Sequence, residues 1–225
     1  MKFSGILFLV AISTMLAVSD GIKTVVFPTK TCTDYVELNP LKSLNLAAFT
    51  LCMRVATELS GHREVILFAY RTTNADELNV WRELDGRLSL YLRTSAGSEA
   101  VHFQVPQLGA LETHLCVTWD SSSGATALFL DGRKSLTKIY KKGHRVQSGG
   151  RVILGQDLDS YRGSFDAKQS FVGEISDVNM WDSVLPDSTI QDMSSGKRVP
   201  RGNVFDWEAT RLEIHGGAKV LNREL

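Results

Sequence analysis

The sequence predicts an all-β fold, a sandwich of two antiparallel sheets with one short helix. Three observations predict it: short stretches with the apolar pattern of strands, two Asp-Gly pairs between such stretches, and a roughly regular spacing of the stretches along the 225 residues. No linker, repeat or low-complexity tract interrupts this pattern. We therefore expect a single domain.

The strand pattern takes two forms. Alternating apolar and polar side chains are typical of strands with one buried face, and they occur at residues 50–55, 88–92 and 115–119. Nearly continuous apolar runs indicate strands that are covered on both faces, and they occur at residues 65–68 and 151–154.

Turns and one helix complete the predicted elements. Asp85-Gly86 and Asp131-Gly132 each separate apolar stretches, and because glycine reaches positive φ without strain we expect a hairpin at both. Residues 186–193 open with Pro-Asp-Ser and carry Ile190 and Met193 three positions apart, followed by a glycine at 196. This segment is the predicted helix.

The N-terminus resembles a secretory signal peptide. Lys2 precedes an apolar stretch that runs to Leu16, and Ala17-Val18-Ser19 is a small-x-small cleavage pattern. The apolar stretch is too short and too interrupted to span a membrane, and no second stretch approaches that length. We expect residues 1–19 to be removed and residues 20–225 to be released as a secreted, extracellular domain with no membrane span.

Composition narrows the function classes. The chain has 25 Lys and Arg against 25 Asp and Glu, which gives no electrostatic reason to expect binding to nucleic acid or to an anionic membrane surface. The five histidines form no His-Glu-x-x-His pair, and neither a Gly-x-Ser-x-Gly elbow nor a phosphate loop is present. We therefore expect no enzyme, and His114 is interpreted as structural.

Three cysteines leave one without a partner in an oxidising compartment. Cys52 and Cys116 lie in alternating apolar stretches that two packed sheets would bring together. Cys32 lies near the expected mature N-terminus and is the odd one, either as a buried free thiol or paired with another molecule.

Several segments together resemble the pentraxin family. Residues 114–121 match its pattern His-x-Cys-x-Ser/Thr-Trp-x-Ser/Thr at every fixed position. Further matches follow in family order at residues 26–28, 154–161, 169–175, 178–182 and 203–207. The resemblance implies a flattened, lectin-like β-jelly roll with one helix, a Cys52–Cys116 disulfide, and assembly as a homo-oligomer, typically a cyclic pentamer.

The densest group of oxygen ligands is an acidic loop. Asp157 and Asp159 stand two residues apart, Asp166 and Gln169 follow, and Gly163 allows the loop to double back. The loop does not match an EF-hand, because Arg162 stands at the position where an EF-hand loop needs glycine. Judged on its residues alone, such a loop is more often a solvated turn than a metal site.

The resemblance favours the metal site, because pentraxins hold two Ca²⁺ ions per subunit. It implies Asp157, the carbonyl of Leu158 and Asp159 as ligands of the first ion, and Asp157, Asp159, Asp166 and Gln169 as the cage of the second. Asp157 and Asp166 stand where mammalian members carry Glu, which shortens their reach by one methylene.

An upstream loop departs from the family pattern. The family contributes an Asp-Asn pair just before Glu-Leu, whereas this chain has Ala75-Asp76 before Glu77. Asp76 then takes the Asn position, and a shortened loop allows Asp76 or Asn74 to substitute. We expect Asp76 to complete the first calcium site.

The resemblance also implies a ligand. Pentraxins bind an anionic phosphate or carboxylate through calcium, and phosphocholine adds a quaternary ammonium that an aromatic and an acidic residue contact. Trp81 and Glu99 match those two positions, and Tyr91 adds bulk at the pocket floor. The expected function is innate, acute-phase pattern recognition, with complement components as further partners. The alternatives are that Trp81 is a core or edge-strand aromatic, and that the chain is a calcium-dependent lectin-like or adhesion module that binds glycans.

Overall fold

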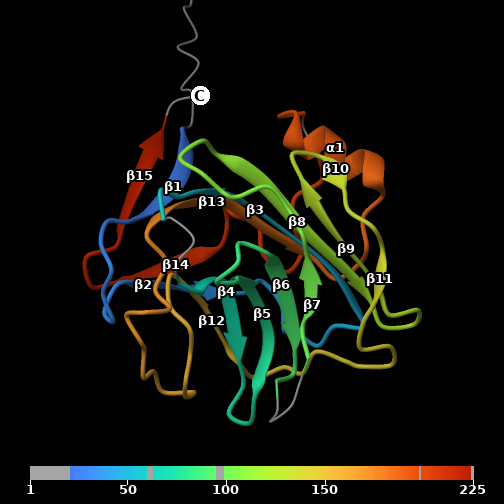
Figure 1. The fold of residues 1–225 in the computed structure, drawn as a ribbon, viewed down its shortest axis with the longest axis horizontal. Coiled ribbons are helices and arrows are strands. Elements are labelled where there is room, and N and C mark those ends of the chain that lie inside the picture. The colour runs from blue at the N-terminus through green and yellow to red at the C-terminus, as the bar shows by residue number, and fades with distance from the viewer. Residues whose placement is uncertain (1–20, 60–62, 95–98, 198, 224–225) are drawn as a thin grey trace, which may run out of the picture.

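The structure is a computed structural model that describes residues 21–59, 63–94, 99–197 and 199–223. The predicted signal peptide lies outside these residues. Within them the chain forms two antiparallel sheets that face each other (Figure 1). The predicted all-β sandwich is therefore confirmed.

The eight-stranded sheet of the described chain is called sheet A. Its strands, in spatial order, are β10 (Arg133–Lys134), β9 (Ala125–Leu130), β8 (Thr113–Asp120), β3 (Ala48–Ala56), β13 (Gly173–Trp181), β1 (Ile22–Phe27) and β15 (Lys219–Arg223), with β11 (Lys138–Ile139) also paired to β9. The predicted turn at Asp131 and Gly132 joins β9 to β10, and both residues have positive φ, 47° and 73°.

The seven-stranded sheet of the described chain is called sheet B. Its strands, in spatial order, are β14 (Arg211–His215), β2 (Tyr35–Asn39), β12 (Arg151–Leu154), β4 (Val65–Arg71), β5 (Asp76–Arg82), β6 (Leu88–Leu92) and β7 (Val101–Phe103). The predicted Asp85-Gly86 hairpin joins β5 to β6, with Gly86 at φ 85°.

The core fills the space between the two sheets. Phe49 and Trp119 from sheet A and Phe68 and Val80 from sheet B are fully buried members of one cluster. Burying a large apolar side chain contributes about 1.5–3 kcal/mol, so this layer supplies most of the driving force for folding. The two strands predicted to be covered on both faces, β4 and β12, are indeed almost entirely buried.

The predicted helix is confirmed as α1 (Asp187–Ser194), which packs on the outer face of sheet A (Figure 1). Its buried residues Ile190 and Met193 contact a second apolar cluster that includes Phe129 and Trp181. Gly196 follows the helix with φ 74°, the left-handed conformation that commonly ends a helix.

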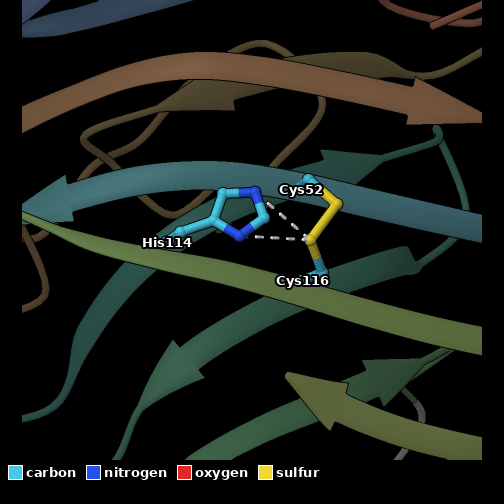
Figure 2. Close-up of side chains that lie close together, drawn as sticks. All are labelled: Cys52, His114 and Cys116. Atoms are coloured by element: carbon cyan, nitrogen blue, oxygen red, sulfur yellow. Dashed lines mark hydrogen bonds between the residues drawn. A yellow bond between two sulfur atoms is a disulfide. The ribbon is translucent and has the colours of Figure 1, made fainter. Parts of the chain in front are cut away.

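The predicted disulfide packs against Ile190 and Met193 of this helix, and Figure 2 shows the bonded sulfur atoms. Cys52 and Cys116 stand directly opposite each other on β3 and β8 and are bonded. The pairing is confirmed, but the expected reason was wrong: neighbouring strands of one sheet bring the sulfurs together, not two packed sheets. Cys32 is exposed and free within the described chain, so a buried thiol is wrong and intermolecular pairing stays a prediction.

His114 lies beside this disulfide and is 2% exposed. Its Nε2 lies 3.6 Å from Cys116 Sγ (Figure 2). Burial, with a smaller contribution from the Arg54 cation, lowers the pKa of His114 to about 4. The imidazole is therefore neutral at physiological pH, in keeping with a structural role.

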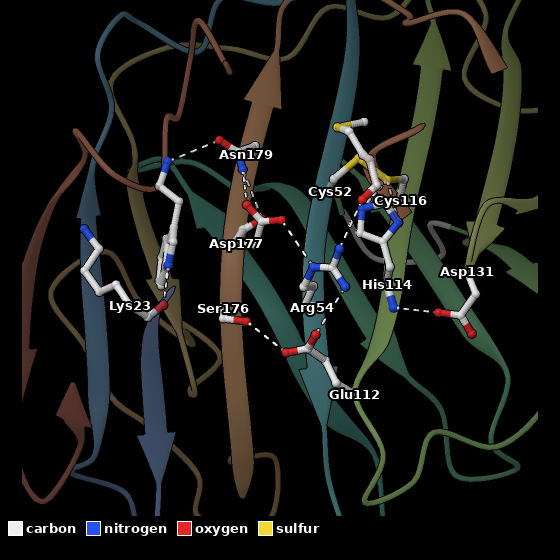
Figure 3. A network of polar contacts seen from close by, with 12 residues as sticks. Lys23, Cys52, Arg54, Glu112, His114, Cys116, Asp131, Ser176, Asp177 and Asn179 are labelled. Carbon is white, nitrogen blue, oxygen red and sulfur yellow. Dashed lines mark hydrogen bonds and ion pairs between the residues drawn. A yellow bond between two sulfur atoms is a disulfide. The ribbon is translucent and has the colours of Figure 1, made fainter. Parts of the chain in front are cut away.

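A polar network ties α1 to sheet A (Figure 3). The guanidinium of Arg54 donates to the Met193 carbonyl (3.1 Å) and pairs with Glu112 (3.2 Å) and Asp177 (3.3 Å). These residues line a cavity of about 480 Å³. Burial raises the pKa of Asp177, and the Arg54 cation acts in the opposite direction. The network fixes the C-terminal end of the helix on the sheet.

Candidate calcium site

The acidic loop joins β12 to β13 and is anchored on the outer face of sheet B. Leu158 is fully buried against Ile66 and Ile153 of that face. The loop doubles back as predicted, because Ser160 and Gly163 form a β-bridge with N···O distances of 3.0 and 3.1 Å. A packed side chain thus sets the position of the two aspartates on either side of it.

Gly155 begins the loop under a steric restriction. Its φ is 90°, and a Cβ at this position would lie 2.3 Å from the Phe27 ring. Only glycine avoids both the left-handed strain and this contact. The direction in which the chain leaves β12, and with it the start of the acidic loop, depends on this residue.

Asp157 is the most perturbed carboxyl group of the loop. It is 8% exposed, and burial raises its pKa to about 7, with further increases from the charges of Asp76 and Asp159. The Arg71 cation and a hydrogen bond from the Leu158 backbone act in the opposite direction and do not offset the burial. A carboxylate of the same loop and a carboxylate from β5 therefore both act on Asp157.

Asp76 reaches this site because β5 is irregular. The β4–β5 register shifts between Tyr70 and Arg71, so that Glu77 is an extra residue in the ladder. Because of this bulge, the side chain of Asp76 lies on the same face of sheet B as the side chain of Asn79, three positions further on. Asp76 pairs with Arg71 and accepts a hydrogen bond from Thr94 Oγ1 (3.0 Å).

Asn79 is a site residue that sequence reasoning missed. Its Nδ2 donates to Asp157 Oδ1 (3.1 Å), and its Oδ1 accepts from the Tyr70 backbone. The side chain is 2% exposed, so it holds Asp157 in place from within sheet B. A polar residue within the apolar alternation of β5 was the available signal.

Asp166 and Gln169 form a second local group further along the loop. The Gln169 backbone N–H donates to the Asp166 carbonyl (2.9 Å), which closes a turn. Gln169 Oε1 is shielded from solvent and finds no hydrogen-bond partner among the described residues. A shielded amide oxygen without a donor is a group that a hard cation satisfies.

The donor set fits Ca²⁺. Carboxylate and amide oxygens are its preferred ligands, and the raised pKa of Asp157 reflects burial first and then the neighbouring carboxylates, a buried charge that a divalent cation neutralises. The structure brings Asp76 and Asp159 close enough to Asp157 to act on its charge, and it joins Asp166 to Gln169 by a turn. That both groups close around two ions, with the Leu158 carbonyl, stays a prediction.

The residues predicted to contact an organic ligand differ in accessibility. Trp81 is only 9% exposed, because it packs with Leu158 and Ile153 on the outer face of sheet B. Tyr91 lies beside this cluster, and its hydroxyl donates to Glu83 (3.3 Å). Glu99 is exposed just before β7. Trp81 therefore exposes only a small part of its side chain.

The fold and the loop define a class of protein: a β-jelly-roll module with a helix on one sheet and an acidic loop on the other. The described residues contain no helix long and apolar enough to cross a membrane.

The family model described as "Pentaxin family" matches residues 23–221, and the chain belongs to this family. It is 52% identical to C-reactive protein of Danio rerio over 222 residues, 96% of this chain and 97% of that protein. It is 40% identical to serum amyloid P-component of Homo sapiens over 195 residues, 86% of this chain and 84% of that protein.

The fold of the family is shared with a solved structure. The native heptameric SAP-like pentraxin of Limulus polyphemus has a TM-score of 0.77 at 25% identity, over 92% of this chain and 98% of that one. The relatives are oligomeric, calcium-binding recognition proteins without enzymatic activity. This chain is accordingly a recognition protein and not an enzyme.

Proposed function

We propose that the chain is a secreted, calcium-dependent pattern-recognition protein that binds phosphocholine or related phosphorylated and anionic ligands on microbes and damaged cells. The observation that carries the proposal is the buried Asp157, whose pKa is raised to about 7 by burial and by the carboxylates of Asp76 and Asp159. Such a charge cluster is costly in the free protein and is relieved by a divalent cation.

Two Ca²⁺ ions per subunit are proposed, held by the residues of the two local groups. Asp157 and Asp159 serve both ions, Asp76 and the Leu158 carbonyl complete the first, and Asp166 and Gln169 complete the second. Bound calcium supplies positive charge with open coordination positions for a phosphate or carboxylate oxygen. Asn79 orients Asp157 through the 3.1 Å hydrogen bond and so acts as a positioning residue.

Retention on a phosphocholine matrix tests the proposal. We expect the protein to bind in calcium and to elute with a chelator. A galactan matrix tests the alternative, a lectin-like module that binds glycans. If the protein is retained only on galactan, and elutes with the chelator, its ligands are glycans and not phosphocholine. If the chelator elutes the protein from neither matrix, the site does not depend on calcium.

Trp81 tests the choline part of the ligand. If the exposed part of its ring face meets the quaternary ammonium beside Glu99, Trp81→Ala weakens phosphocholine binding by roughly 1–2 kcal/mol, the scale of a partly desolvated cation–π contact. Phosphoethanolamine is expected to lose much less. Because Trp81 packs against Leu158, Trp81→Phe is the control that retains most of the apolar contact. Equal losses for both ligands in calorimetry would assign Trp81 to the packing of the loop.

Assembly and export follow from the same proposal. We expect a homo-oligomeric ring, a pentamer, whose mass in native mass spectrometry separates five subunits from the seven of the Limulus relative. Complement components are proposed partners of the assembled ring. We expect the protein secreted from eukaryotic cells to begin at residue 20, which N-terminal sequencing would show. A protein that retains residues 1–19 would refute the predicted cleavage.

A further inference from the structure

Three metal-ligating side chains gather at the edge of sheet B, and none of them is a predicted calcium ligand. Glu37 lies on β2, and Glu213 and His215 lie on β14. One ligand atom from each of the three lies within 4.8 Å of the other two. The cluster joins residues more than 170 positions apart, because β2 and β14 are neighbouring strands.

The strand register explains why these side chains meet. Glu37 stands directly opposite Glu213, and His215 stands opposite Tyr35. Side chains two positions apart in a strand share a face, so Glu213 and His215 point the same way as Glu37 and Tyr35. Two carboxylates placed directly opposite each other repel unless a cation lies between or beside them.

The imidazole of His215 is fixed by ring stacking, but one of its nitrogens has no hydrogen-bond partner among the described residues. Its ring stacks on Tyr35, with a centroid distance of 4.2 Å and an interplanar angle of 10°. Its Nε2 is shielded from solvent and has no hydrogen-bond partner among the described residues. A shielded ring nitrogen without a partner is uncommon in folded proteins, and metal coordination is one of the ways to satisfy it.

Both carboxylates are oriented from outside the cluster. Arg151 donates to both oxygens of Glu37 (2.9 and 2.6 Å), and Asn39 Nδ2 donates to Glu213 Oε1 (2.9 Å). Arg211 Nη2 lies 3.7 Å from the same Glu213 oxygen. An ionised carboxylate has about four acceptor positions, so each still has one for a metal. Hydrogen-bonded carboxylates of this kind are the usual ligands of metal sites.

We infer that Glu37, Glu213 and His215 form a site for a divalent transition-metal ion of the Zn²⁺ type, with three protein ligands and an open position for water. One imidazole and two carboxylates suit such an ion, whereas Ca²⁺ takes oxygen ligands alone. The site shares no predicted ligand with the calcium loop, although it borders it: Tyr35 also contacts Phe165 (4.8 Å between ring centroids), and Arg151 donates to the Tyr161 carbonyl (3.0 Å).

Calorimetric titration of ZnCl₂ into the calcium-saturated full protein tests the inference. Saturating calcium occupies the calcium loop, and a Cys32→Ser background removes the exposed thiol, which would otherwise bind zinc. We expect one zinc ion per chain, with affinity at least tenfold lower in His215→Gln and in Glu213→Gln. His102→Gln is the matched control, because His102 is half-buried on β7 of the same sheet.

Three results would overturn the inference: no zinc binding by the parent protein, an unchanged isotherm in His215→Gln, or an equal loss in His102→Gln. Asp157→Asn provides a separate check on the location. It is expected to retain zinc binding, and loss of the zinc isotherm in this variant would place the ion in the calcium loop instead. Chelator-sensitive phosphocholine retention by His215→Gln would show that this variant is folded.

Discussion

Asp157→Asn is expected to abolish calcium-dependent retention on phosphocholine, with an apparent calcium affinity reduced by at least a hundredfold. Asp157 is proposed to serve both ions, so its loss removes charge and coordination from each. The amide is nearly isosteric with the carboxylate and keeps an acceptor oxygen for Asn79 Nδ2, so the loop is expected to keep its shape. Asp159→Ala is expected to have the same effect on binding.

The same variant is expected to be more stable than the parent protein when calcium is absent. Because burial raises the pKa of Asp157 to about 7, an ionised Asp157 at pH 8 destabilises the calcium-free fold, and an amide removes that cost. Thermal unfolding in chelator at pH 8 measures this effect. Asp192→Asn, on the helix of the opposite sheet, is the control and should change neither property. Normal calcium-dependent binding by Asp157→Asn would refute the site.

The sequence predicts the buried strands and does not predict the more exposed strands at the edges of the two sheets. β4, β6 and β8 carry clear apolar patterns, and the structure confirms them. β14 and β15 are mostly exposed or half-buried; β15 carries no alternating pattern, and β14 alternates over only five residues, with Ile214 exposed. They exist because β2 and β1 offer free edges, which is a property of the assembled sheets and not of a local segment.

In the candidate site, too, the features that are local in the sequence were predicted and those that depend on strand pairing were not. The acidic loop and Gly163 are local in the sequence, and their arrangement was predicted. Asn79 was missed because its contact with Asp157 spans 78 positions and depends on β5 lying two strands away from β12. The bulge that places Asp76 on the same face of sheet B as Asn79 likewise depends on the pairing of β4 with β5. The accessibility of Trp81 depends on Leu158 packing against it, which no strand pattern reveals.

Mild acid is expected to destabilise the protein through His114. Because burial lowers its pKa to about 4 from an ordinary value of 6.5, the unfolded chain takes up a proton between these pH values and the folded chain does not. Stability is therefore fully present above pH 6.5 and is lost as pH falls toward 4. Between pH 7.5 and pH 4.5 this single group accounts for about 2–3 kcal/mol of the free energy of unfolding.

Urea unfolding of the parent protein and of His114→Phe, at both pH values, in chelator and at one protein concentration, measures this contribution. Other groups titrate over the same interval, but they do so in both proteins, so the difference between the two losses isolates His114. Phenylalanine has no titrating nitrogen and fills the apolar cluster beside the Cys52–Cys116 disulfide. We expect the parent protein to lose about 2–3 kcal/mol more than the variant. Equal losses would mean that His114 becomes protonated without unfolding, and the buried, neutral imidazole described above would then be wrong.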